Sequence, residues 1–146
     1  MAEVYDVAAW RHYRTAEILQ DAGQGDDASY HFGITGETAL KSALRVSGCE
    51  AAWIAAGTKL KNTPMRGHFH QLGDLVQSTA LEIGAFASGR LAQPIAAYVL
   101  NPAFQTRFQG WHIDIRYADP DLTPVNAADL DRFQRDAEDL LLALVI

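Results

Sequence analysis

The chain has 146 residues, of which 49% are hydrophobic and 21% are charged, and its only cysteine is Cys49. This length and composition predict a single folded domain over residues 1–146, and they exclude a disordered chain or a fold held by internal disulfides. The formal net charge of −6 argues against broad, nonspecific binding of nucleic acid, which requires a basic surface, but it allows a local basic site.

The first part of the chain has the pattern of two long helices. Apolar residues recur at helical spacing from about Val4 to Asp21, and again from about Asp27 to Val46. Between them, residues 22–27 contain glycines that end the first helix and an aspartate, Asp26 or Asp27, that is expected to cap the second. The inner face of the second helix is expected to consist of Phe32, Gly36, Ala39, Ala43 and Leu44.

Two glycines, Gly33 and Gly36, stand inside the second predicted helix. Each of them lowers helix stability by roughly 1 kcal/mol relative to alanine. We therefore expect a neighbouring helix to approach the backbone closely at these two positions.

The middle of the chain contains one further long helical pattern. Residues 49–57 fit a short helix, and residues 58–67 are typical of an exposed basic loop that proline and glycine interrupt. Apolar residues then return at helical spacing from His68 to Ile83, which predicts a third long helix. Residues 84–90 are expected to form a connector or a bend.

Two proline sites divide the part that follows. Gln93–Pro94 opens one helical piece, and Asn101–Pro102 supplies an N-cap and a first-turn proline for another. Apolar residues continue a helical face beyond it, but residues 111–117 also alternate like a strand, so both interpretations stay open there. Residues 118–124 have the composition of a loop.

The last helix is expected to begin near Asn126, with Asp129 placed for a capping interaction. With about four to six helical segments and no convincing sheet, the chain is predicted to be all-α, folded as an antiparallel helical bundle.

Several short motifs occur in a fixed order along these helices. The second helix carries Glu37 and Lys41 in "GETALKSAL", the third begins with His70 in "HQLGDL", and Arg116 and Tyr117 in "IRYADP" precede the last helix. In this order the motifs resemble those of the HEPN family of small helical domains, and the resemblance covers most of the chain. The chain departs from the family pattern in two places, with Gly36 where alanine is frequent and Ala118 where proline usually follows the Arg-Tyr pair.

The resemblance implies a HEPN-like bundle of four to five helices that usually forms a homodimer. Many members of the family are metal-independent endoribonucleases of toxin–antitoxin, antiviral or RNA-processing systems. Others lack the catalytic pair and act as nucleotide-binding or interaction domains, often beside a small nucleotidyltransferase partner.

The catalytic pair of the active members is an arginine and a histidine with four to six residues between them. Here Arg107 and His112 have that spacing. Histidine can move a proton near neutral pH, and arginine can hold a phosphate and stabilise developing charge. Two side chains five positions apart on a regular helix, however, point about 140° apart around its axis. A break at Gly110 or pairing across a dimer is therefore needed to bring the two together. The alternative is a solvated Arg107 and a structural pairing of His112 with Asp114.

The resemblance also implies a nucleotide-binding set, consisting of Glu37, Lys41, His70, Arg116 and Tyr117. Each member has a structural alternative. Glu and Lys four residues apart stabilise a helix by roughly 0.2–0.5 kcal/mol without any further role. Likewise, an arginine can tether a loop, and a tyrosine can pack with its hydroxyl satisfied.

No metal or cofactor is expected. His70 and Asp74 share a helix face, but His68 and His70 are two residues apart and would not converge on a regular helix. Two small basic groups could contact RNA or an acidic partner, although a solvated face is the alternative for both: Arg11, His12 and Arg14, and Lys59, Lys61 and Arg66.

The sequence therefore favours a binding or regulatory domain that acts with a nucleotidyltransferase partner or binds RNA or a nucleotide. One alternative is a metal-independent endoribonuclease that uses Arg107 and His112, and another is an unrelated structural bundle. No apolar run reaches the roughly 18 residues of a membrane span, no signal peptide is evident, and a lone cysteine fits a reducing compartment. We therefore expect a cytoplasmic protein without membrane contact.

Overall fold

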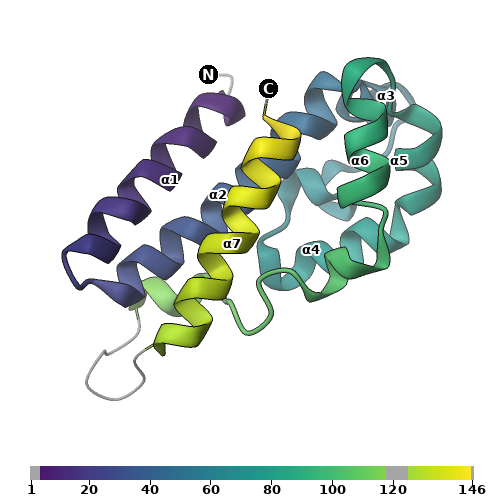
Figure 1. The fold of residues 1–146 in the computed structure, drawn as a ribbon. Coiled ribbons are helices and arrows are strands. Elements are labelled where there is room, and N and C mark those ends of the chain that lie inside the picture. The colour runs from purple at the N-terminus through teal and green to yellow at the C-terminus, as the bar shows by residue number, and fades with distance from the viewer. Residues whose placement is uncertain (1–3, 118–124, 146) are drawn as a thin grey trace.

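A computed structural model of the chain describes residues 4–117 and 125–145, and every regular element within them is helical (Figure 1). The α-helices are α1 (Tyr5–Asp21), α2 (Gly25–Val46), α3 (Cys49–Ala55), α4 (Phe69–Ser78), α5 (Ala80–Phe86), α6 (Ala92–Tyr98) and α7 (Ala127–Leu144). The short 3-10 helices are η1 (Leu60–Asn62), η2 (Pro64–Arg66), η3 (Gly89–Leu91), η4 (Pro102–Thr106) and η5 (Ile113–Tyr117). The prediction of an all-helical chain is thus confirmed for these residues, and of the two interpretations of residues 111–117 the strand is not found.

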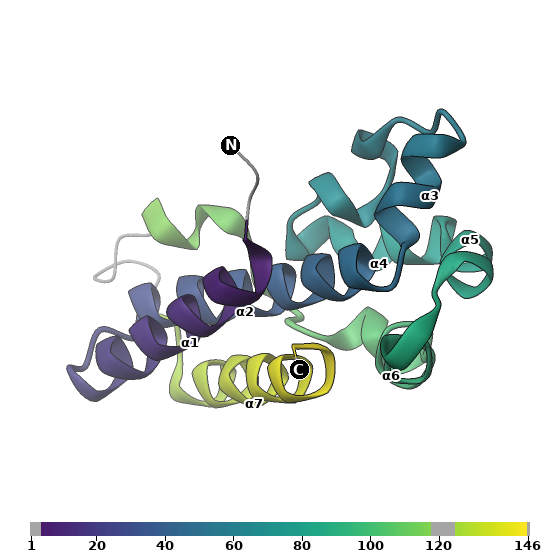
Figure 2. The ribbon, with the colours of Figure 1, turned by 90° about the horizontal axis from the view of Figure 1, so that it is seen from above.

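Helix α2 lies at the centre of the molecule. Helices α1 and α7 pack along it, and Figure 2 shows α7 on one side of α2 with η5 on the other. Helices α3 to α6 gather at the end of α2 that leads into α3 (Figure 1). All residues from 32 to 44 are buried, including the five expected to form an inner face. Polar side chains in this buried stretch therefore need hydrogen-bond or ion-pair partners within the protein.

At Gly33 and Gly36 of α2, aromatic rings lie against the helix backbone. A Cβ atom at Gly33 would come within 2.0 Å of Cε2 of Trp111, and one at Gly36 would come within 2.6 Å of Cε2 of Phe108. The indole Nε1 of Trp111 donates a hydrogen bond of 2.8 Å to the carbonyl oxygen of Ser29. The close approach predicted from the glycines is present, but most of it comes from side chains that flank η4 and η5 and not from a packed helix.

Two helix boundaries differ from the sequence prediction. Helix α2 begins at Gly25 with Gln24 as its N-cap, so the prediction of an aspartate cap is wrong. The carboxylate of Asp26 instead accepts a hydrogen bond of 2.7 Å from the backbone N–H of Val125. The helix expected from His68 to Ile83 is divided at Thr79, whose hydroxyl donates to the carbonyl oxygen of Leu75 at 2.6 Å. Such a bond from a side chain to the preceding turn favours a bend.

Other local predictions are confirmed. Asn126 caps α7, since its Oδ1 accepts from the backbone N–H of Asp129 at 2.8 Å while its amide donates to the carboxylate of Asp129. Asn101 accepts from the backbone N–H of Ala103 at the start of η4. The predicted loop at 118–124 lies outside the described residues. None of the helices in the described part of the chain is long and apolar enough to cross a membrane.

A pair of histidines joins α1 to α2. Nδ1 of His12 lies 2.9 Å from Nδ1 of His31, so one ring donates and the other accepts. Burial, followed by the proximity of His31 and Arg11, lowers the pKa of His12 to about 4. Burial also lowers the pKa of His31, while nearby Asp27 acts in the opposite direction. The folded protein therefore holds this pair uncharged under conditions in which free histidine is partly protonated.

The histidine pair predicts a loss of stability in acid. The folded pKa of His12 lies below its ordinary value of 6.5, so the unfolded chain binds more protons as the pH falls. Stability is fully present above about pH 6.5 and declines toward about pH 4, by an amount on the order of 1 kcal/mol for this partly exposed group. Urea unfolding at about pH 7 and pH 5 should show a smaller decline for His12→Gln than for the wild type. An equal decline in both proteins would contradict this role.

Candidate functional site

The site begins with an ion pair on the buried stretch of α2. Nζ of Lys41 lies 3.3 Å from Oε2 of Glu37, and the two side chains are only 10% and 6% exposed. The spacing of four residues places both on one side of the helix, as the sequence indicated. Their burial separates this pair from the many solvent-exposed pairs that only stabilise a helix surface.

His68 contacts the same carboxylate from the start of α4. Its Nδ1 lies 2.9 Å from Oε1 of Glu37, while its side chain remains 45% exposed. Because an ionised carboxylate only accepts hydrogen bonds, Nδ1 of His68 carries the hydrogen in this contact. The other ring nitrogen, Nε2, is then an acceptor when the ring is neutral. Glu37 thus fixes the tautomer of His68. In catalytic and ligand-binding histidines, the hydrogen bond of one ring nitrogen commonly determines the state of the other.

Two further histidines stack beside His68. The ring centroids of His68 and His70 are 6.3 Å apart, and those of His70 and His112 are 4.0 Å apart, with interplanar angles of 23° and 29°. We call Glu37, Lys41, His68, His70 and His112 the histidine cluster. It joins α2, the beginning of α4 and the residue that precedes η5, which are far apart in the sequence.

His112 is held locally by Asp114. The backbone N–H of Asp114 donates to Nδ1 of His112 at 3.1 Å, and Oδ2 of the same aspartate lies 3.3 Å from that nitrogen. The pairing of His112 with Asp114 that the sequence left open is therefore present. It does not bury the imidazole, which is 49% exposed and presents a face to His70.

The cluster is electrostatically crowded. Burial is the largest cause that lowers the pKa of His70, and the neighbouring His112 and His68 lower it further. Asp114 and Glu37 act in the opposite direction but do not reverse the shift. His70 is therefore more often neutral in the free protein than an isolated histidine would be at the same pH.

Arg107 lies in a different environment from His112. Its Nη1 is within 3.2 Å of Asp136 and 3.0 Å of Asp139, so the guanidinium is held against α7. Phe108 follows with a positive φ of 54°, and its backbone N–H also bonds to Asp136. The chain turns at this residue, which leaves Arg107 on α7 and directs the following residues toward α2. The structure therefore does not bring Arg107 and His112 of one chain into one site.

The remaining predicted residues are placed in part. Arg116 and Tyr117 belong to η5, which packs on α2, but their side chains lie outside the described residues.

Within the part of the chain that the structure describes, no group of three or more histidine, cysteine or acidic side chains could hold a metal ion. The three imidazoles thus stack as rings and do not converge through their nitrogen atoms.

His68 is the member of the cluster that the sequence prediction assigned neither to the nucleotide-binding set nor to the catalytic pair. Regular helical geometry would have separated its side chain from that of His70. His68 is, however, the N-cap of α4, with extended backbone angles of φ −106° and ψ 163°. The extended residue brings its ring alongside that of His70. The signal available in the sequence was the "GHFH" segment directly before the helical pattern, where a cap residue is expected.

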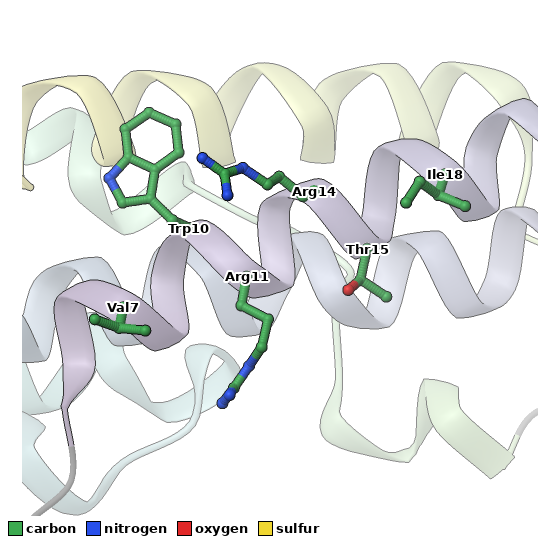
Figure 3. A pocket seen from close by; sticks show the side chains of 6 residues that line it. All are labelled: Val7, Trp10, Arg11, Arg14, Thr15 and Ile18. Atoms are coloured by element: carbon green, nitrogen blue, oxygen red, sulfur yellow. The ribbon is translucent and has the colours of Figure 1, made fainter.

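A second surface lies on the outer side of α1, away from this cluster in the sequence. A groove of about 500 Å³ is lined by Val7, Trp10, Arg11, Arg14, Thr15 and Ile18. Figure 3 shows Trp10 and Arg14 extending on one side of the helix and Arg11 on the other. Val7 and Ile18 are 56% and 69% exposed, so α1 presents apolar residues outward as well as toward α2. Neither arginine has an ion-pair partner among the described residues, although Arg14 lies over the ring of Trp10.

Comparison of the chain with protein-family models, with curated proteins and with solved structures finds no match in any of the three.

Proposed function

We propose that this chain is a HEPN-like binding or regulatory domain that binds the phosphodiester of RNA or a nucleotide at the histidine cluster. The observation that carries the proposal is the convergence of Glu37, Lys41, His70 and His112 on one site. These residues come from sequence motifs that are widely separated in the chain. A purely structural role for each of them gives no reason for them to meet.

The chemistry of the cluster suits such a ligand. Imidazole N–H groups donate hydrogen bonds to phosphate oxygens, and the faces of exposed rings stack on bases, which is the common mode of single-strand recognition. His68 and His112 are each about half exposed, so both are accessible to a ligand. The cluster is compact, which agrees with an acidic protein that has a local nucleic-acid site and no broad basic surface.

A protein partner belongs to the same proposal. The outer groove of α1 combines exposed apolar side chains with Arg11 and Arg14, which suits an apolar partner surface that also carries carboxylates. A second copy of the chain and a nucleotidyltransferase are the partners that the family resemblance implies.

Binding of a short, fluorescently labelled single-stranded RNA tests the proposed site. The variant His70→Gln/His112→Gln is expected to bind at least about tenfold more weakly, since each lost contact to a phosphate or base contributes roughly 1–3 kcal/mol. The matched control is His12→Gln, which removes a histidine outside the cluster and should retain wild-type affinity. Circular dichroism checks the fold of each variant. Equal affinities in the wild type and the cluster variant, or no binding by the wild type, would contradict the proposal.

One observation favours the endoribonuclease as a second candidate. The carboxylate of Glu37 orients His68 so that Nε2 can accept a proton from a ribose 2′-OH, and His112, which stacks on His70 in the same cluster, would serve as the acid for the leaving oxygen. In this version Arg107 takes no part within the protomer, since α7 holds it. Incubation of RNA with the protein in EDTA separates the candidates. Cleavage that His68→Ala and His112→Ala both abolish supports the enzyme, and binding without cleavage supports the binding domain.

A further inference from the structure

The histidine cluster brings three imidazole rings close to two carboxylates and one ammonium group. Its titratable and charged members are Glu37 and Lys41 from α2, His68 and His70 from the start of α4, and His112, and the carboxylate of Asp114 lies beside His112. With all three imidazoles neutral, two carboxylates face one ammonium group. The free cluster then has a net charge of about −1, which opposes the approach of a phosphodiester.

Protonation of one imidazole brings this net charge to about zero, and protonation of two makes it positive. Each protonated imidazole adds one positive charge, yet the ring centroids are only 4.0 Å and 6.3 Å apart, so imidazolium ions repel one another. Glu37 is already shared between Lys41 and His68, and its charge is therefore largely compensated. His70, between the other two rings, has the least opportunity to become charged while the site is empty.

An anion that enters the cluster counteracts the repulsion between protonated imidazoles. Its negative charge lies beside the imidazoles, offsets their mutual repulsion and stabilises their protonated forms. We propose, resting on the function proposed above, that the histidine cluster takes up at least one proton when it binds a phosphodiester. Affinity for RNA then rises as the pH falls through the range in which histidine titrates. Phosphodiesters themselves do not titrate in this range, so the proton must be taken up by the protein.

The test measures affinity and proton uptake on the intact chain. The dissociation constant of a labelled single-stranded RNA is measured by fluorescence anisotropy at about pH 6, 7 and 8 at constant ionic strength. Uptake of one proton strengthens binding by up to about tenfold for each pH unit. Calorimetry at about pH 7, in two buffers with different enthalpies of ionisation, gives the number of protons independently. His70→Gln should bind with a flatter pH dependence and a smaller uptake.

The control variant is His12→Gln. The pKa of His12 is about 4, so this residue stays neutral over the range measured and its loss should leave the pH dependence unchanged. RNA binding whose affinity does not vary with pH, without proton uptake, would overturn this inference and leave the proposed function intact. Absence of binding at every pH would overturn the proposed function itself. A pH dependence that His68→Gln, His70→Gln and His112→Gln each leave unaltered would place the proton outside the cluster and also overturn the inference.

Discussion

Gly33→Ala is expected to lower the free energy of unfolding by about 2–4 kcal/mol. The added methyl group would lie 2.0 Å from Cε2 of Trp111, which no side chain can tolerate, so the indole has to move. Overpacking of this kind costs about 1–3 kcal/mol. The buried hydrogen bond from Trp111 to Ser29 is lost as well, at about 1–3 kcal/mol, while alanine regains roughly 1 kcal/mol of helix propensity.

Urea unfolding followed by circular dichroism measures this effect. The matched control is Gly84→Ala, also within an α-helix, where the added Cβ would be an ordinary 3.7 Å from Leu100. This control should be neutral or slightly stabilising. Gly33→Ala should in addition weaken the proposed RNA binding, because Trp111 directly precedes His112. A variant as stable as the control would mean that Trp111 is not seated on Gly33 in solution.

Glu37→Leu is expected to destabilise the protein by about 3–5 kcal/mol, because it leaves the ammonium group of Lys41 nearly buried without a partner. An exposed pair of the same spacing would contribute only about 0.2–0.5 kcal/mol, so the measurement distinguishes the buried site from an ordinary helix pair. The double variant Glu37→Leu/Lys41→Met should recover most of the loss, since replacing both charges by apolar side chains of similar size is often neutral.

The double variant also separates stability from function. It is expected to fold, but it lacks the carboxylate that orients His68, so the proposed RNA binding should be weaker than in the wild type. Recovery of both stability and binding would show that Glu37 and Lys41 serve the fold alone. A single variant that loses less than about 1 kcal/mol would contradict the burial of the pair.

The sequence was informative wherever one regular helix determined the geometry. The all-helical chain followed from the spacing of apolar residues, and the meeting of Glu37 and Lys41 followed from their separation by four positions. The close contacts on α2 were expected from Gly33 and Gly36. The division at Thr79 was missed because a hydroxyl bond to the preceding turn does not alter the apolar pattern.

The site could be predicted only in part, because irregular backbone decides where its outer residues lie. Counting positions along a helix could not show that His68 is extended and therefore lies beside His70. Nor could it place the positive φ of Phe108, which turns the chain between Arg107 and His112. The partners of Arg107 come from α7, about thirty residues later, and only the tertiary fold brings them there.

Phe108 and Trp111 pack on α2, and the residues of the cluster are therefore held in place by different parts of the fold. Glu37 and Lys41 lie within a helix that is enclosed by the core, so they stay in place as long as the whole protein is folded. His112 belongs to a segment of short 3-10 helices that two aromatic rings attach to the glycines of α2. Local opening of that segment would dismantle the site while α1, α2 and α7 remain assembled, so the availability of the site and the global stability of the protein are separate quantities.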